Sequence, residues 1–269
     1  MKNTLFPLII FLLFLGSCNK TQVEDKTIQL QDSTEVPALN LAVVDSVKVQ
    51  DSVRVSEMLT LSFRSKVLTF PNITNKIFLD SIYSDAALSL TDYSKKNIEK
   101  ELKAKQLQYV NETKESMKDF SPEVAQVWEQ NSDMKLLSTM KGFMTVQYTN
   151  SGYTGGAHGY YNETHKVFNV TTNKTLQLED ILRIKDRQVW NRILMENFLE
   201  NDLEKGQSEM LLVKKIPLTN NFYFDKENLY FFYNQYEITA YAAGPVTIKI
   251  PYSEVKPFLN SEFRAALDL

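Results

Sequence analysis

Residues Tyr153–Tyr161 read Tyr-Thr-Gly-Gly-Ala-His-Gly-Tyr-Tyr, and this stretch decides how the rest of the chain is organised. Three of its nine residues are glycine, and the stretch lies between two runs with β-strand character. Glycine tolerates positive φ and lets another backbone approach closely, so the stretch predicts a specific turn and not a generic loop. The strand-rich region over residues 134–149 and the run over 160–170 are therefore predicted to pair as antiparallel strands.

Other strand patterns surround this hairpin on both sides in the sequence. Residues 58–70 place apolar side chains in a β-favouring context that ends at Pro71, and residues 246–250 alternate apolar and polar side chains. Residues 222–233 contain two aromatic runs separated by Asp225–Asn228, a composition that predicts a second β-hairpin.

Helical periodicity appears in four other segments. Apolar residues recur at helical spacing over residues 75–90, 94–117 and 186–205, and a short helix is predicted over 253–259. Helices interspersed with hairpins, without βαβ repeats, predict an α+β fold with an antiparallel sheet and helices packed on one face. Within it we expect an N-terminal half over residues 57–175 and a C-terminal half over residues 176–269.

The first residues have the pattern of a bacterial lipoprotein signal peptide. Lys2 provides a positive start, Leu5–Leu15 is an apolar run too short to span a bilayer, and Leu-Gly-Ser-Cys at residues 15–18 resembles a lipobox. We expect residues 1–17 to be removed and Cys18, the single cysteine of the chain, to carry the lipid anchor. The alternative is a free thiol in an ordinary signal peptide. Lipidation predicts a cell-envelope protein, and the lack of an acidic run after Cys18 favours the outer membrane, facing the periplasm.

Residues 18–56 have the composition of a flexible tether. The segment from Asn19 to Ser56 contains no aromatic residue and is rich in Asp, Ser, Thr, Gln and Val, so it can bury little apolar area. Within it, Val43–Val55 alternates apolar and polar residues in places, which leaves an edge strand as the alternative for that part.

The sequence contains no established catalytic or metal-binding motif. Its two histidines, His158 and His165, lie seven residues apart without an H-E-x-x-H pattern or a cysteine nearby. No G-x-S-x-G, Walker or Rossmann motif occurs, and no spacing of carboxylates singles out an acid/base pair. We therefore expect no catalytic residue, no metal and no cofactor. His158 is predicted to bond nearby backbone, with a catalytic base as the alternative, and His165 to share a strand face with Tyr161 and Glu163.

Tyrosines crowd the glycine-rich stretch and residues 230–252. A tyrosine offers a large flat surface and one hydroxyl group at low entropic cost, which suits recognition of a protein or a glycan. The alternative for each of them is packing within the sheet, with the hydroxyl group tying a loop. The candidate binding residues are Tyr153, Gly155, Gly156, His158, Tyr161, Tyr233, Tyr236 and Tyr241.

Two groups of motifs resemble a known family. The motifs lie at Tyr153–His158, Phe168–Val170 and Leu176–Leu182, and then at Leu229–Ile238, Tyr241–Pro245 and Ile250–Tyr252. In this order they resemble the domain of unknown function shared by the lysozyme-binding anti-sigma factor RsiV and the non-catalytic region of the deacetylase PdaC. The resemblance extends from about Ser56 to the end, and it implies an RsiV/PdaC-like fold in a lipoprotein member of the family from the Bacteroidetes.

The resemblance implies a function in binding. In RsiV the extracellular domain binds lysozyme, so the implied partner is a lysozyme-like protein or peptidoglycan, besides the membrane that holds the lipid. We expect neither a spanning helix nor a deacetylase domain, so sigma-factor control and deacetylase chemistry do not carry over. The charge is mixed, with a formal net value of −3 and no basic stripe, which argues against nucleic acid as a partner. A lipid-anchored binding module is the leading hypothesis; the alternatives are an enzyme acting on envelope polymers and a structural accessory of an envelope complex.

Overall fold

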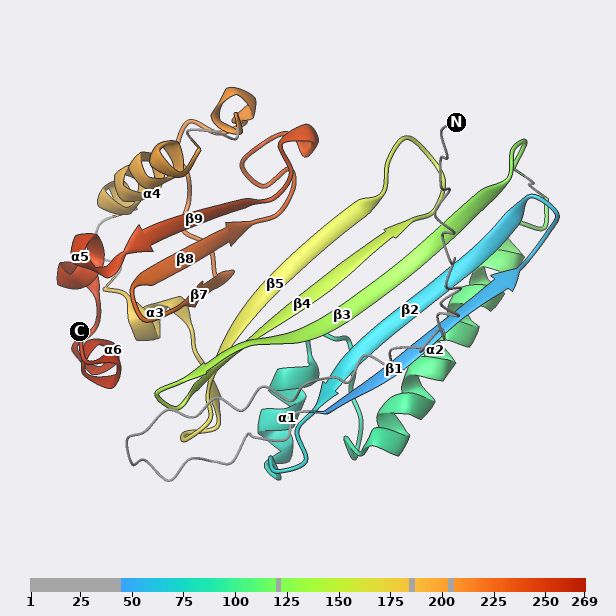
Figure 1. Cartoon of the computed structure of the whole chain (residues 1–269), viewed down its shortest axis with the longest axis horizontal. Helices are drawn as coiled ribbons and strands as arrows, with labels where there is room; N and C mark the ends of the chain where they lie inside the picture. Colours follow the sequence, from blue (N-terminus) through green and yellow to red (C-terminus); the bar gives the residue numbers. More distant parts are fainter. Residues whose placement is uncertain (1–44, 120–121, 184–186, 203–205) are drawn as a thin grey trace, which may run out of the picture. The chain divides into compact units, whose positions relative to one another are not determined.

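The computed structural model describes residues 45–119, 122–183, 187–202 and 206–269, which form two β-sheets and several helices. The first sheet contains six strands in the order β1 to β6, and the second contains three in the order β7-β8-β9 (Figure 1). The predicted α+β class is therefore confirmed. The predicted signal peptide, Cys18 and the tether up to residue 44 lie outside the described residues. No helix in the described ranges is both long and apolar enough to cross a membrane.

The predicted glycine-rich hairpin lies within the first sheet, between β4 and β5. Every neighbouring pair of strands is antiparallel except β2 and β3, which are parallel. This pair is parallel because the chain between the two strands passes through helices α1 and α2 before it re-enters the sheet. The strands are β1 (Asp45–Arg54), β2 (Leu59–Thr69), β3 (Gln126–Met140), β4 (Phe143–Tyr153), β5 (Tyr160–Asn169) and β6 (Lys174–Thr175).

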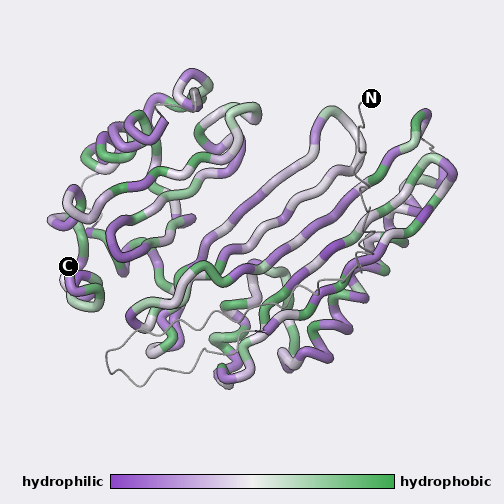
Figure 2. Tube along the Cα trace, viewed as in Figure 1, coloured by the Kyte–Doolittle hydropathy of each residue, from purple (hydrophilic) through white to green (hydrophobic). Residues whose placement is uncertain are grey.

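Helices α1 (Lys76–Tyr83) and α2 (Lys95–Ser116) provide the apolar cover of this sheet. Phe78 of α1 and Ile98 of α2 are buried in the same hydrophobic cluster as apolar residues of β1, β2, β4 and β5. Asn75 caps α1, because its side-chain oxygen accepts a hydrogen bond from the Phe78 amide at 3.0 Å. Figure 2 shows α2 as largely hydrophilic with scattered hydrophobic residues, as expected for a helix that buries only a thin apolar line.

Strand β1 corrects the predicted extent of the tether. Val47 and Val49 are buried, and the ten residues Asp45–Arg54 pair with β2 along their whole length. Asp51 also accepts a hydrogen bond from Gln106 of α2 at 2.6 Å and one from the next amide, Ser52 N, at 2.8 Å. The prediction of a flexible segment up to Ser56 is therefore wrong for these residues. The alternative of an edge strand is correct, because two valines and a neighbouring strand outweigh the polar composition.

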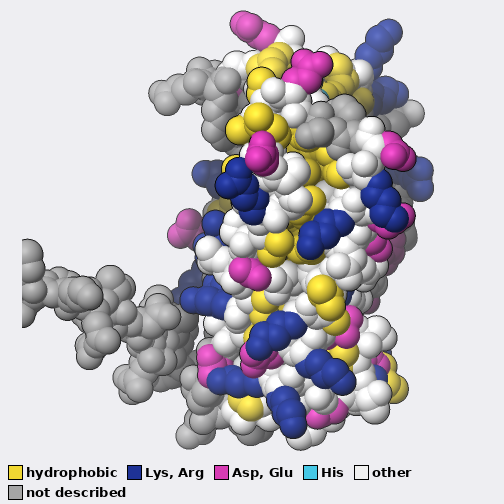
Figure 3. Space-filling view, turned by 90° about the vertical axis from the view of Figure 1, so that its right-hand side faces the viewer, with side chains coloured by type: hydrophobic (Ala, Val, Ile, Leu, Met, Phe, Trp, Pro, Cys, Tyr) yellow, Lys and Arg dark blue, Asp and Glu magenta, His cyan; other side chains and the backbone are white. Residues whose placement is uncertain are grey.

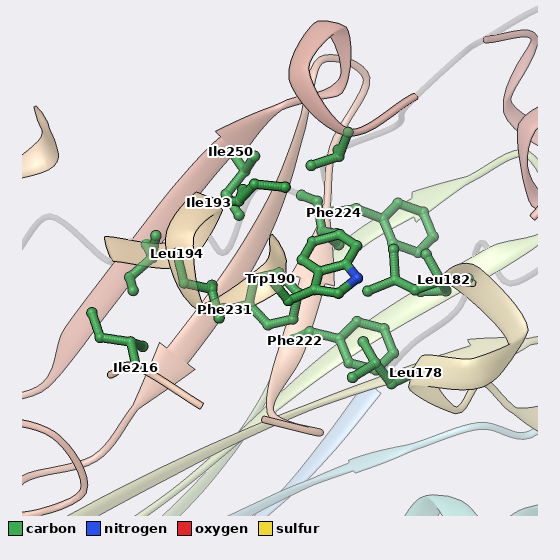
Figure 4. Packing of buried hydrophobic residues seen from close by; sticks show 14 of the residues in the cluster. Leu178, Leu182, Trp190, Ile193, Leu194, Ile216, Phe222, Phe224, Phe231 and Ile250 are labelled. Carbon is green, nitrogen blue, oxygen red and sulfur yellow. The ribbon is translucent and has the colours of Figure 1, made fainter. Parts of the chain in front are cut away.

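The second sheet packs around a separate hydrophobic cluster. Trp190 of α4 is buried among Leu178 and Leu182 and the aromatic side chains of β7 and β8 (Figure 4). The predicted hairpin over residues 222–233 and the predicted strand over 246–250 are both present. The elements are α3 (Leu178–Ile181), α4 (Arg187–Asn201), β7 (Phe222–Phe224), β8 (Asn228–Tyr233), β9 (Val246–Pro251), α5 (Tyr252–Val255) and α6 (Ser261–Leu267), with 3-10 turns η1 (Ser208–Met210), η2 (Tyr241–Ala243) and η3 (Lys256–Phe258).

Residues of the first sheet complete this second core. Phe143 of β4 and Val167 of β5 belong to the same cluster as Trp190. The ring centroid of Phe143 lies 5.5 Å from that of Phe224 and 6.3 Å from that of Phe263 in α6. Helix α6, which the sequence analysis did not predict, therefore closes a core built from both parts of the chain.

Candidate functional site

The glycine-rich stretch forms the turn between β4 and β5, and its glycines are required by backbone geometry. Gly155 and Gly156 have φ values of 87° and 98°, a region that residues with a Cβ rarely adopt. A Cβ on Gly155 would also lie 3.1 Å from Cζ2 of Trp128 in β3, whereas nothing lies within 4 Å at Gly156. Tyr153 closes the turn, because its hydroxyl group donates to Gly156 O at 3.0 Å.

The turn contacts the segment that follows β8. The Tyr241 hydroxyl group donates a hydrogen bond to Gly159 O at 3.1 Å. The rings of His158 and Tyr241 stack with their centroids 4.0 Å apart and an interplanar angle of 25°. Nδ1 of His158 lies 2.8 Å from Gly159 O, as predicted for a turn residue bonded to nearby backbone. Two candidate regions that are distant in the sequence therefore adjoin.

Tyr236 extends this aromatic contact into solvent. Its ring centroid lies 5.8 Å from that of Tyr241, and 59% of the residue is exposed. Its φ of 68° is unusual for a residue with a Cβ. A second tight turn, over residues 234–239, is held by hydrogen bonds from Tyr236 N to Thr239 O at 3.1 Å and from Glu237 N to Asn234 O at 3.1 Å. Tyr236 thus combines an exposed aromatic ring with a strained backbone conformation. Strained residues cluster at functional sites.

Tyr161, Glu163 and His165 form a polar row on one face of β5, as strand alternation predicts. The Tyr161 hydroxyl group donates to Oε2 of Glu163, and Oε1 of Glu163 lies 3.1 Å from Nε2 of His165. Glu163 and His165 are only 8% and 2% exposed. The His165 ring lies against Tyr223 and Phe232, with centroid distances of 4.4 Å and 5.1 Å.

Two asparagines of the C-terminal region bind the open edge of β5. Oδ1 of Asn221 accepts a hydrogen bond from His165 N at 2.8 Å, and its Nδ2 donates to Glu163 O at 2.7 Å. Oδ1 of Asn234 accepts from Glu163 N at 2.7 Å, and its Nδ2 donates to Glu163 O at 3.1 Å. These amides take the place of a neighbouring strand. Sequence reasoning missed both asparagines, because no local pattern marks a side chain that binds a strand about sixty or seventy residues away.

The electrostatics of this row follow from its hydrogen bonds. Burial by itself raises the pKa of Glu163, but hydrogen bonds from His165, Tyr161 and Gln147 outweigh it, so the pKa is lowered from its ordinary 4.5. Burial and the bond to Glu163 raise the pKa of Tyr161 far above its ordinary range. His165 has an oxygen acceptor opposite each ring nitrogen, Glu163 at Nε2 and Asn221 Oδ1 at 3.1 Å from Nδ1.

The row helps to hold the fold together, since its side chains are bonded to one another and to Asn221. Both carboxylate oxygens of Glu163 and both ring nitrogens of His165 already have partners. Asp180, a carboxylate within the family-like motif Leu176–Leu182, closes the capping box of α3 by accepting from Gln177 N at 2.7 Å. Within the described ranges, no three His, Cys, Asp or Glu side chains are grouped so that they could hold a metal ion.

The structure therefore separates the candidate binding residues into three sets and one buried residue, Tyr233. Tyr153, Gly155 and Gly156 build the turn, whereas His158, Tyr236 and Tyr241 form the aromatic contact at its side. Tyr161 belongs to the polar row. Tyr233 is 1% exposed and donates its hydroxyl hydrogen to Pro217 O at 2.6 Å, so its prediction as a binding residue is wrong. It faces the second core, because β8 is buried on the side from which Tyr233 projects.

Two family models match consecutive regions of the chain. The model described as "Deacetylase PdaC" matches residues 55–161, and the one described as "Protein of unknown function (DUF3298)" matches residues 167–253. The first match ends and the second begins within β5. No protein of curated function matches the chain.

Two solved structures share the fold. A member of the DUF3298 family from Bacteroides fragilis NCTC 9343 is 24% identical, with a TM-score of 0.66 over 83% of this chain and 95% of its own. A DUF3298 family protein from Pseudomonas aeruginosa PAO1 is 18% identical, with a TM-score of 0.55 over 82% of this chain and 96% of its own. A region that matches the PdaC model is followed by one that matches the DUF3298 model, so the chain is DUF3298- and PdaC-like, as its glycine and tyrosine motifs indicate.

Proposed function

We propose that this protein is a lipid-anchored binding module of the bacterial cell envelope. Its contact surface is formed by the glycine turn and the segment Tyr236–Tyr241, and its ligand is a lysozyme-like protein or wall glycan. The observation that carries the proposal is the stack of His158 on Tyr241 beside the exposed ring of Tyr236.

The anchor is argued from the N-terminal sequence. The lipobox-like residues 15–18 follow an apolar run of signal-peptide length, and Cys18 is the single cysteine that could be acylated. Several acyl chains on one residue hold a protein at a membrane without a spanning helix. Attachment at Cys18 places the module at the outer membrane, facing the periplasm. The test is metabolic labelling with palmitate, which should tag the wild-type protein and not the Cys18→Ala variant.

The contact surface is argued from rigidity and chemistry. Aromatic rings that are held in place before binding lose little entropy when a ligand arrives. The hydrogen bond from Tyr241 to Gly159 and the stack on His158 fix two of the three rings, and the tight turn fixes the backbone that carries the third, Tyr236. Rings of this kind bind either an apolar protein surface or the flat face of a sugar.

The proposal is tested with lysozyme and with soluble peptidoglycan fragments as probes. We expect one of them to bind the purified full chain, and Tyr236→Ala to weaken that binding about tenfold or more, since a central tyrosine contributes about 2 kcal/mol. Ile77→Ala is the matched control, because Ile77 of α1 is 79% exposed and outside the surface. If neither probe binds, or if both variants weaken binding equally, the proposed surface is wrong.

A further inference from the structure

The face of the first sheet turned away from α1 and α2 carries a second surface, built from polar side chains. A hollow of about 500 Å³ lies over strands β1 to β4. Among the residues that line it, only Val49 is apolar, and its side chain is buried in the cluster beneath α1 and α2. The hollow is therefore lined by hydroxyl, amide and charged groups.

These groups are arranged in rows that cross the strands in register. One row places Arg64 of β2 opposite Gln50 on one side and Asn131 on the other, and continues through Ser151 to Tyr161 of β5. The next row runs from Lys48 through Lys66, Asp133 and Thr149 to Glu163 of β5, whose carboxylate is buried. Neighbouring strands are about 4.8 Å apart, so the first row spans roughly 19 Å from Gln50 to Tyr161.

The hollow is basic, although the chain as a whole is slightly acidic. Lys48, Arg64 and Lys66 line it together with one acidic residue, Asp133, which gives three positive charges against one negative. Lys66 lies 3.5 Å from Asp133, whereas among the described residues no acidic side chain pairs with Lys48 or Arg64. The face drawn in Figure 3 differs, because basic and acidic side chains are interspersed there. Two unpaired cations over a polar floor are complementary to an anion.

We propose that this face binds an anionic carbohydrate chain, with carboxylates of uronic acid residues at Lys48 and Arg64. Arginine and lysine bind carboxylates, and the asparagine, serine and threonine side chains of the same rows can bond sugar hydroxyl groups. An acidic peptide fits less well, because the hollow offers no apolar pocket that would anchor a side chain. The surface is separate from the His158–Tyr241 contact, so either proposal can fail without the other.

The experiment is a calorimetric titration of the purified full chain with an oligogalacturonate, and with a maltooligosaccharide of equal length as the uncharged counterpart. We expect the oligogalacturonate to bind and the maltooligosaccharide not to bind. The double variant Lys48→Ala/Arg64→Ala should weaken binding about tenfold, because two exposed ion pairs together contribute roughly 1.4 kcal/mol. Arg64→Gln, which keeps most of the side-chain volume, should produce part of that loss. Tyr236→Ala should leave binding unchanged.

The matched control removes two positive charges from α2, outside the hollow. Lys96 and Lys100 are exposed on α2, and Lys96→Ala/Lys100→Ala should change the affinity less than twofold. An equal loss in this control would show attraction to any cation and overturn the site. Absence of binding at millimolar oligogalacturonate would also overturn it. Equally tight binding of polyglutamate, with the same loss in Lys48→Ala/Arg64→Ala, would replace the carbohydrate by an acidic peptide.

Discussion

At the scale of single residues, the glycine turn offers two positions at which a substitution strains the backbone, but only one at which the new side chain also meets a neighbour. Gly155 and Gly156 both have positive φ, but only Gly155 faces the Trp128 ring. A Cβ at either position raises the energy of the backbone, and a Cβ at Gly155 must also displace an indole. The two positions therefore form a natural pair for comparison.

We expect Gly156→Ala to lower the free energy of unfolding by about 1–2 kcal/mol and Gly155→Ala by about 2–4 kcal/mol, since the second adds overpacking to strain. Urea denaturation followed by far-UV circular dichroism measures both. Equal losses would show that the Trp128 ring can move aside with no loss of stability, and that backbone strain alone requires glycine at both positions.

Glu163 provides a second residue-scale prediction, which depends on pH. Its pKa is lowered in the folded state, so the unfolded chain binds the proton more readily. The stabilisation from this carboxylate is therefore complete above about pH 4.5 and is lost as the pH falls through the lower folded-state pKa. At pH 7, Glu163→Gln should cost about 2 kcal/mol, because the amide has one acceptor oxygen where the carboxylate has two, and either the Tyr161 hydroxyl group or the His165 ring loses its acceptor.

The measurement is the free energy of unfolding between pH 3 and 7, for the wild type, Glu163→Gln and Glu200→Gln. Glu200 is an exposed residue of α4 and should behave as the wild type. The difference between the wild type and Glu163→Gln should shrink as the pH falls below 4.5. A difference that stays constant across this range would mean that Glu163 does not titrate as its contacts require.

At the scale of secondary structure elements, β5 is the strand that joins the first sheet to the C-terminal region. It pairs with β4 on one side, whereas β6 and the side chains of Asn221 and Asn234 bind its backbone on the other. A strand edge satisfied by side chains leaves no free ladder for another chain. The same principle applies to β1, where Asp51 accepts a hydrogen bond from Ser52 N.

Asn221→Ala should lower the free energy of unfolding by about 2 kcal/mol, because it leaves the buried His165 amide without an acceptor. Hydrogen exchange should show faster exchange at His165 N than in the wild type. The control is Asn220→Ala, an exposed neighbour for which we expect a change within about 0.5 kcal/mol. Unchanged protection at His165 would contradict the role assigned to Asn221.

At the scale of the whole molecule, the shared core predicts cooperative unfolding of the described part of the chain. Phe143 of the first sheet packs against Phe224 and Phe263 in the second cluster, so the core of the second region is completed by residues of the first. Two regions that match different family models should therefore melt together.

Trp190 lies in the second cluster, and the only other tryptophan is Trp128 in β3. In a Trp128→Phe background, the fluorescence of Trp190 and the far-UV signal of the whole chain should give the same denaturation midpoint. Adding Phe143→Ala should lower both midpoints together, at a cost of about 3–5 kcal/mol. Two separate transitions in the Trp128→Phe protein would show that the regions fold independently.

The sequence by itself determined the α+β class, the glycine hairpin, the hairpin over residues 222–233, the main helices and the shared face of Tyr161, Glu163 and His165. All of these follow from local conformational preference and from periodicity along one segment. Tertiary structure decided the parallel pairing of β2 with β3, the folding of β1, the burial of Tyr233, and the roles of Asn221 and Asn234. These features depend on contacts between segments that are distant along the chain. A local sequence pattern does not indicate which distant residue will bond a strand edge or cover an apolar side chain.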